Sequence, residues 1–296
     1  MEARVRAGLQ DVEQRLGAAV ESDAPFVAEA SRHLMNAGGK RFRPMLVLVA
    51  AEFGDANALG VVTSAVGVEL THLASLYHDD VMDEADLRRG AKSANARWDN
   101  SVAILTGDFL FAQASEVIAD LGPDAVRIQA RTFARLVEGQ IRETVGPQGG
   151  EDPLQHYLRV VADKTGSLIS TSARYGAMMS GAGERVETLL TEFGERIGSA
   201  FQLSDDVIDI ASETGESGKT AGTDLREGVP TLPVLIARTS SDPRDARLLE
   251  LLDSDLSDDS RHAEALALLR EHDALRQARA EVSRTADEAR KLLEEL

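Results

Sequence analysis

The order of apolar and charged residues along the chain predicts helices almost throughout. Residues 3–20 place apolar residues at helical spacing, and residues 272–295 are rich in Ala, Glu, Leu and Arg, which favour helices. No run of alternating β-branched residues indicates a strand. Between the two ends, apolar stretches predict further helices over residues 44–54, 60–83, 100–120, 125–144, 154–180 and 185–210. We therefore expect an all-α fold.

Glycine, proline and polar residues mark where the predicted helices end. Breaks fall at Gly38-Gly39 and Gly122-Pro123, and again over residues 146–153 and 181–183. Two longer polar segments lie near residues 84–100 and 211–230, and long loops in a compact domain are often functional. No linker rich in Pro, Ser or Gly divides the chain. We expect residues 1–296 to form one domain.

Composition narrows the classes of function. The chain has 296 residues, of which 43% are hydrophobic, enough for a sizeable core. Its formal charge of −18 repels nucleic acid and anionic lipid, so we expect no nucleic-acid partner. The absence of cysteine excludes disulfides and thiolate metal sites. The longest apolar run, residues 44–51, is too short to span a bilayer, so we expect a cytoplasmic protein without a transmembrane segment.

Two acidic motifs of the same form follow apolar stretches. Residues 79–83 read Asp-Asp-Val-Met-Asp, and residues 205–209 read Asp-Asp-Val-Ile-Asp. Helical residues four apart lie on one face, so the first and last aspartates of each motif can bind one cation. Magnesium prefers carboxylate oxygens and leaves positions open for phosphate oxygens. A solvated acidic face is the alternative, but close like charges among apolar residues are costly without a counterion.

Basic residues beside glycines suggest the anion that would meet these cations. They occur in residues 38–44, 86–90, 163–166 and 218–219. Arginine binds diphosphate oxygens through two parallel hydrogen bonds, and lysine supplies a point charge. Any one set alone is more typical of a solvated surface. Together with two magnesium-type motifs in an acidic chain, the four sets indicate a diphosphate pocket.

These segments resemble the trans-isoprenyl diphosphate synthases, or polyprenyl synthetases, over nearly the whole chain. The resemblance is carried by residues 39–44, 72–90, 107–110, 139–140, 164–166 and 201–233. It implies an antiparallel all-α bundle around a deep central cavity, the isoprenoid synthase fold, in a homodimer. It also implies a magnesium-dependent prenyltransferase that condenses isopentenyl diphosphate head-to-tail (1'-4) with an allylic diphosphate.

The resemblance also assigns roles to single residues. It implies about three magnesium ions per active site, bound by Asp79, Asp83 and Asp205, with Asp80 and Asp209 close by. The residues implied to hold the allylic diphosphate are Arg88, Lys164 and Lys219. Those implied to hold isopentenyl diphosphate are Lys40, Arg43, His72 and Arg89, although a histidine on an apolar helix can equally be a core residue. Thr165 and Gln202 would flank the carbocation, and Gln140 would line the same cavity.

One position departs from the family pattern, and two other functions stay in view. Many members have lysine where this chain has Val229, so either Lys219 and Arg226 compensate or diphosphate binding is weaker. A class I terpene cyclase shares the first acidic motif, but its second motif usually mixes Asn, Ser or Thr with Glu. A non-catalytic subunit of a heteromeric synthase typically lacks an intact motif, whereas this chain keeps both.

Small residues before the first motif predict a long product. In short-chain members a bulky aromatic often lies four or five residues before the first aspartate, where this chain has Ser75 and Ala74. Phe133 is the candidate that ends the cavity, and Tyr77 could narrow it. We expect a long-chain trans-polyprenyl diphosphate, of the kind that supplies quinone side chains. The alternatives are a farnesyl or geranylgeranyl (C15 or C20) synthase, or close helix packing at Ala74 and Ser75.

Overall fold

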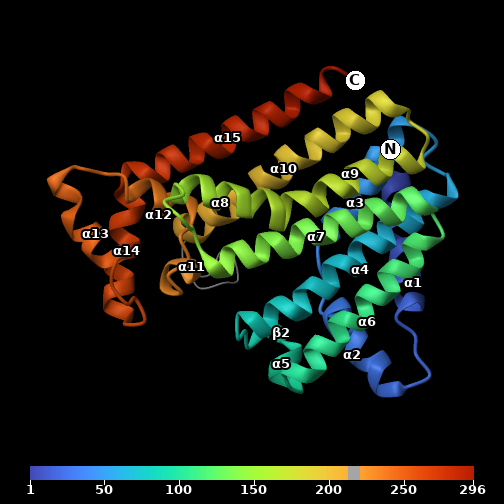
Figure 1. Cartoon of the computed structure of the whole chain (residues 1–296), viewed down its shortest axis with the longest axis horizontal. Coiled ribbons are helices and arrows are strands. Elements are labelled where there is room, and N and C mark those ends of the chain that lie inside the picture. Colours follow the sequence, from blue (N-terminus) through green and yellow to red (C-terminus); the bar gives the residue numbers. More distant parts are fainter. Residues whose placement is uncertain (213–220) are drawn as a thin grey trace. The chain divides into compact units, whose positions relative to one another are not determined.

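The computed structural model describes residues 1–212 and 221–296, and helices dominate it (Figure 1). The all-α prediction is confirmed. The longer helices are α1 (Glu2–Ala19), α2 (Pro25–Asn36), α3 (Phe42–Ala50), α4 (Leu59–Met82), α6 (Asn100–Ala119), α7 (Pro123–Val145), α8 (Pro153–Val161), α9 (Ser167–Met179), α10 (Glu184–Ala211), α14 (Asp259–Glu271) and α15 (Asp273–Leu293). The shorter ones are α5 (Ala94–Arg97), α11 (Thr223–Arg226), α12 (Leu232–Ala237), α13 (Ala246–Leu252) and the 3-10 turns η1 (Ala51–Phe53) and η3 (Pro243–Asp245).

The structure differs from the pattern-based prediction in several segments, since the helices α2, α5 and α11 to α14 were not expected. The helix expected over residues 154–180 is interrupted by η2 (Ala162–Gly166), a π-helical turn between α8 and α9. Within the polar segment after the first acidic motif, β1 (Leu87–Arg88) pairs antiparallel with β2 (Ala91–Lys92). A hairpin of two-residue strands is too short to show an alternating pattern, and a π-helical turn keeps the apolar composition of its neighbours.

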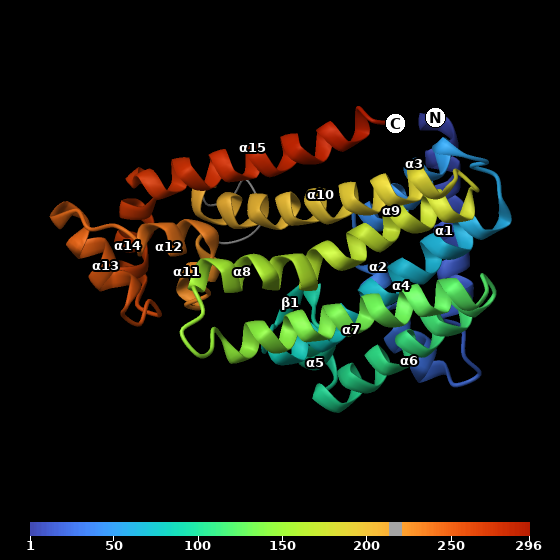
Figure 2. The same cartoon turned by 45° about the horizontal axis from the view of Figure 1, so that its top comes forward.

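The chain divides into two compact units. Unit 1 comprises residues 1–134, 168–194 and 296, and unit 2 comprises residues 135–167 and 195–295. In unit 1, α4 and α6 run side by side (Figure 2). Glycines permit this close approach, because a Cβ atom on Gly67 would lie 2.4 Å from Ile118 and one on Gly107 would lie 2.4 Å from His78.

Unit 2 has its own apolar core. Leu203, Val207 and Ile210 project from α10 into a cluster of buried side chains, in which α12 packs against α15. The other large members of this cluster are Leu225, Leu232, Val234, Leu248, Leu251, Leu252, Leu256, Leu266, Leu269 and Leu275. Burial of this apolar surface holds α10 in place, and with it the second acidic motif.

Two helices, α4 and α6, are long and apolar enough to cross a membrane by length and composition alone. In the most apolar window of α4, 67% of the residues are buried inside the protein, as expected for a core helix. The corresponding share in α6 is 33%, so much of this apolar helix is exposed.

Candidate active site

The first acidic motif ends α4 in unit 1. Asp80 is completely buried, Asp79 is half-buried and Asp83 is exposed. Arg88 donates from Nε to Asp80 Oδ1 at 2.5 Å, and burial raises the pKa of Asp80 against the lowering effect of Arg88. The other carboxylate oxygen, Oδ2, is buried without a hydrogen-bond partner in the described chain. A buried acceptor of this kind fits a nearby cation.

The β-hairpin presents Arg88 and Arg89 just after this motif. Arg89 and Gly90 form its turn with φ of 54° and 77°, as a two-residue hairpin turn of this hand requires. Across the described chain, the three non-glycine residues with positive φ are Arg41, Glu84 and Arg89. Each lies within two residues of a side chain predicted to bind magnesium or diphosphate. Backbone strain of this kind concentrates at functional sites.

Cationic side chains gather around one buried glutamate in unit 1. Arg41 donates to Glu69 at 3.1 Å and also pairs with Glu13, while Glu69 is only 2% exposed. Arg89 donates to the carbonyl oxygens of Leu34, at 3.1 Å, and Gly38. The guanidinium groups of Arg41 and Arg89 flank Gly39, where a Cβ atom would lie 2.9 Å and 3.0 Å from them. Gly39 also has a φ of 149°, a backbone conformation that other residues rarely adopt, so glycine is favoured at this position.

Arg43 belongs to this cationic cluster, and His72 lies beside it. Arg43 makes no side-chain hydrogen bond within the described residues, and its buried Nε has no partner. Burial lowers the pKa of Arg43, and repulsion from Arg89 lowers it further against the attraction of Glu69. Burial, followed by repulsion from Arg43 and Arg89, holds the pKa of His72 well below 6.5. The cluster thus carries more positive charge than its carboxylates balance, as an anion site requires.

Three of the four residues predicted to hold isopentenyl diphosphate therefore lie within electrostatic range of one another: Arg43, His72 and Arg89. Lys40 is exposed on the adjoining loop, and its side chain makes no hydrogen bond or ion pair with the described residues. The sequence reasoning missed Arg41 and Glu69, which hold the cluster together. A glutamate within the apolar stretch of α4 was the available signal for Glu69.

The second acidic motif lies near the end of α10 in unit 2. Asp205 is exposed, Asp206 is 3% exposed and Asp209 is half-buried. Asp209 accepts hydrogen bonds from the backbone amides of Thr223 and Asp224, both at 3.2 Å, and so anchors the start of α11. Among the described residues, no three His, Asp or Glu side chains form a metal-binding group by themselves.

The π-helical turn η2 carries Lys164 and Thr165. It packs tightly against α7, because a Cβ atom on Gly139 would lie 2.7 Å from the backbone nitrogen of Lys164. Arg135 clamps the turn to α10 by donating to Asp163 at 3.1 Å and to Glu195 at 2.6 Å. Single π-helical turns occur often at functional sites.

Four polar side chains of unit 2 form a chain of hydrogen bonds. Thr165 donates to Gln202 Oε1 at 3.1 Å, and Gln202 donates from Nε2 to Asp206 Oδ1 at 3.0 Å. Tyr157 donates to the other oxygen of Asp206. The structure thus brings together Thr165 and Gln202 as predicted, and adds Tyr157, which no sequence signal marked.

Two further residues predicted for the site, Lys164 and Gln140, also lie in unit 2. Lys164 is half-buried and donates to Glu143 at 2.5 Å. Gln140 Oε1 is buried without a hydrogen-bond partner in the described chain. Glu143 thus supplies a temporary counterion, which an incoming diphosphate can replace at Lys164.

The predicted chain-length residues lie in unit 1. Ala74 is completely buried and Ser75 is 8% exposed, its hydroxyl donating to the carbonyl of His72 at 2.9 Å. The Phe133 ring packs 4.2 Å from that of Phe111. Tyr77 is buried, and its hydroxyl donates to the carbonyl of Ala30 on α2 at 2.5 Å. This hydroxyl is thus tied to α2.

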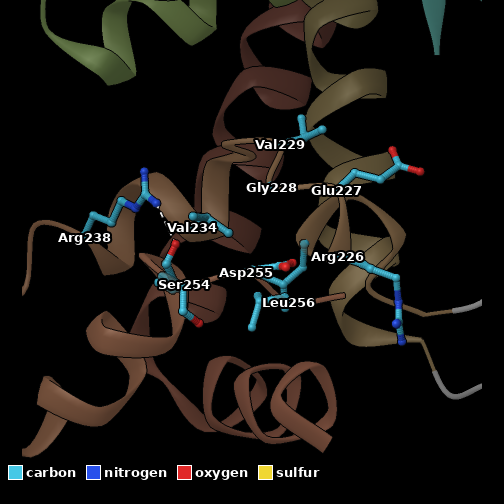
Figure 3. A pocket seen from close by; sticks show the side chains of 11 residues that line it. Arg226, Glu227, Gly228, Val229, Val234, Arg238, Ser254, Asp255 and Leu256 are labelled. Carbon is cyan, nitrogen blue, oxygen red and sulfur yellow. Dashed lines mark hydrogen bonds between the residues drawn. The ribbon is translucent and has the colours of Figure 1, made fainter. Parts of the chain in front are cut away.

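The turn around Val229 is where many members of the family have a lysine and this chain does not. It borders a pocket of about 180 Å³ lined by Arg226, Arg238 and Asp255, and Arg226 extends away from Val229 (Figure 3). Arg226 donates to the carbonyl of Ser257 at 3.0 Å and pairs with Asp259 at 2.9 Å. This arginine therefore holds the turn against the start of α14. The other candidate for compensation, Lys219, lies outside the described residues.

Comparison with known proteins decides the family. The polyprenyl synthetase family matches residues 24–269. The chain belongs to the polyprenyl synthetase family. Its sequence is 49% identical over 289 residues to the nonaprenyl diphosphate synthase of Mycobacterium tuberculosis, covering 97% of this chain and 86% of that protein. Membership identifies the chain as a prenyltransferase.

Solved structures of this family match the fold closely. The geranylgeranyl pyrophosphate synthase of Corynebacterium glutamicum, complexed with calcium and isoprenyl diphosphate, gives a TM-score of 0.90 at 47% identity, covering 100% of this chain and 90% of that one. The decaprenyl diphosphate synthase of Rhodobacter capsulatus gives 0.89 at 34% identity, covering 98% and 90%. The isoprenoid synthase fold that the resemblance implies is therefore confirmed.

Proposed function

We propose that this polyprenyl synthetase condenses isopentenyl diphosphate with an allylic diphosphate to build a long-chain trans-polyprenyl diphosphate. The observation that carries the proposal is the cluster of Arg41, Arg43 and Arg89, whose positive charge exceeds that of its carboxylates. In a chain of charge −18, such a positively charged cluster indicates a binding site for an anion. A diphosphate supplies the missing negative charge and the acceptors that Arg43 lacks.

The acidic motifs fit magnesium as its partial ligands. Each motif offers two aspartates one helical turn apart, Asp79 with Asp83 and Asp205 with Asp209, rather than a complete cage. Magnesium is bound in just this way, through one or two carboxylates plus water and substrate phosphates. The Corynebacterium glutamicum enzyme is complexed with calcium, another divalent cation, and isoprenyl diphosphate, which supports a metal and a diphosphate as ligands of this chain. When bound, the metal ions neutralise the charge that grows on the leaving diphosphate.

The residues of this chain would perform the remaining work. Lys164 and Arg88 hold the allylic diphosphate while its C–O bond breaks. Lys40, Arg43, His72 and Arg89 hold isopentenyl diphosphate so that its alkene attacks the allylic carbon, forming the new C–C bond. Thr165 and Gln202 direct oxygen dipoles at the carbocation. The proton lost from the adduct passes to the departed diphosphate.

Product length has two candidates. The long-chain proposal rests on the small residues at Ala74 and Ser75 and on the similarity to nonaprenyl and decaprenyl synthases. A C20 product is the second candidate, because the geranylgeranyl synthase of Corynebacterium glutamicum is 47% identical to this chain.

We also propose that the protein acts as a cytoplasmic homodimer. The exposed apolar side chains of α6, among them Ile104 and Leu105, offer a surface that a second copy would cover.

Incubation with labelled isopentenyl diphosphate, an allylic primer and magnesium tests the proposal directly. We expect diphosphate products longer than C20 on chromatography after dephosphorylation. A C15 or C20 product would overturn the chain-length assignment alone. Cyclic hydrocarbons would indicate a terpene cyclase, and the absence of any product would indicate a non-catalytic subunit.

A further inference from the structure

We propose that Tyr157 is a positioning residue that fixes, through Asp206 and Gln202, the direction of the Thr165 hydroxyl dipole. The proposal rests on the proposed function, because it concerns the side chains that would face the carbocation. Tyr157 itself lies on α8 and is linked to Thr165 only through the hydrogen-bonded chain.

The hydrogen bonds of the structure set the order of donors and acceptors in this chain. Both oxygens of Asp206 accept hydrogen bonds, one from the Tyr157 hydroxyl and the other from the Gln202 amide nitrogen. Gln202 must therefore turn its amide NH₂ toward Asp206. Its carbonyl oxygen then faces Thr165, whose hydroxyl must donate.

This order of hydrogen bonds fixes the orientation of the Thr165 hydroxyl. Because its proton is committed to Gln202, the lone pairs of Thr165 Oγ1 are left for any other partner. A carbocation is stabilised by the negative end of a dipole and destabilised by the positive end. A freely rotating hydroxyl would present its proton part of the time, so the chain ending in Tyr157 removes an unfavourable orientation before the substrate ionises.

Burial keeps water from replacing the hydrogen bond between Tyr157 and Asp206. Asp206 is 3% exposed, and burial raises the pKa of the Tyr157 hydroxyl, which stays a donor throughout the physiological range. Without Tyr157, one buried carboxylate oxygen would lose its donor, and Asp206 would rotate or capture water. The amide of Gln202 would then lose the constraint that keeps its carbonyl on Thr165.

Tyr157→Phe tests the inference in the full-length enzyme with magnesium and both substrates. We expect kcat to fall about tenfold, as for a lost hydrogen bond to a charged group. The KM for isopentenyl diphosphate and the magnesium concentration for half-maximal rate should stay unchanged, since the cationic cluster and Asp205 keep their partners. Tyr175→Phe is the matched control, because Tyr175 is also buried but donates only to the carbonyl of Ala125. It should retain wild-type kcat.

A double variant separates positioning from general damage. In a Thr165→Val background the hydroxyl dipole is gone, so adding Tyr157→Phe should change kcat less than twofold. If Tyr157→Phe does not fold, Asp206→Asn serves instead, since an amide can accept only through its oxygen and must confront one donor with its NH₂. An unchanged kcat in the single variant, or the same tenfold loss in both backgrounds, overturns the inference. Wild-type activity in the same assay separately tests the proposed function.

Discussion

The aspartates of each acidic motif differ in what surrounds them. The middle residue is buried in both motifs: Asp80 accepts from Arg88, and Asp206 accepts from Tyr157 and Gln202. The first and last aspartates are one helical turn apart, whereas the middle one points about 100° away from the first. The same five-residue motif therefore supplies two carboxylates on one face and an anchor toward the interior.

Removing an outer aspartate should abolish turnover without unfolding the protein. Asp205→Ala deletes an exposed carboxylate, and we expect kcat/KM to fall by more than about a hundredfold with little change in the unfolding midpoint. Asp79→Ala should behave alike. Asp287→Ala, which removes an exposed carboxylate from α15, is the control and should leave kcat/KM at the wild-type value. Near-normal activity of either motif variant at saturating magnesium would contradict the metal assignment.

His72 should make the fold less stable in mild acid. Its pKa lies well below 6.5 in the folded protein, so below pH 6.5 the unfolded chain binds a proton that the folded protein does not. The free energy of unfolding should therefore fall as pH drops from 6.5, by up to about 1.4 kcal/mol per pH unit. Urea unfolding between pH 8 and 5.5 measures this slope. His72→Gln should flatten it, and parallel curves for the two proteins would refute the prediction.

At the scale of elements, periodicity predicts the long helices but not their interruptions. The stretch 125–144 matches α7 because its apolar residues repeat on one face, and 100–120 matches α6 because it is a long apolar stretch that ends before Gly122-Pro123. The pattern does not predict the helices α2, α12, α13 and α14, and it predicts a continuous helix where the turn η2 lies. In η2 the backbone is fixed by tertiary contacts, from Gly139 behind the turn and Arg135 across it, which lie outside the local pattern.

In the candidate site too, the sequence predicts residues that belong to a local motif but not those placed by tertiary contacts. Asp79, Asp83, Asp205 and Lys164 could be found because each belongs to a local motif. Tyr157 could not, because it meets Asp206 from 49 residues away and sits in an ordinary amphipathic helix. Residues that orient a site through space leave no spacing signal in a single sequence.

The helix α4 should help set product length through Ala74. Ala74→Phe places a ring where the side chain is now completely buried, and we expect shorter products together with a stability loss of about 1–3 kcal/mol from overpacking. Phe133→Ala removes the ring beside Phe111 and should lengthen the products. Chromatography of the dephosphorylated products measures both. Unchanged lengths in two folded variants would show that Ala74 only permits close packing of α4 against α6.

For the whole molecule, the contrast between the net charge and the local charge determines where an anionic substrate can bind. The chain carries 50 acidic and 32 basic residues, yet Arg41, Arg43 and Arg89 gather in one cluster of unit 1. A strongly acidic surface disfavours non-specific anion binding. Tight binding of a diphosphate therefore has to be local, through this cluster and through cations held by the acidic motifs.

The exposed apolar helix α6 predicts a twofold dimer. Its composition would suit a buried helix, but only 33% of its most apolar window is buried within one chain, and Leu105 is 66% exposed. An exposed face of this kind is stable in water when another apolar surface covers it, and a second copy in twofold symmetry is the commonest solution. Light scattering should give twice the chain mass of 31.8 kDa.

Leu105→Lys should shift the protein toward the monomer because it places a charge in the covered face. Leu59→Lys, at an 88% exposed leucine at the start of α4, is the control and should leave the dimer intact. A monomeric wild type would refute the dimer, and an intact Leu105→Lys dimer would move the interface away from α6.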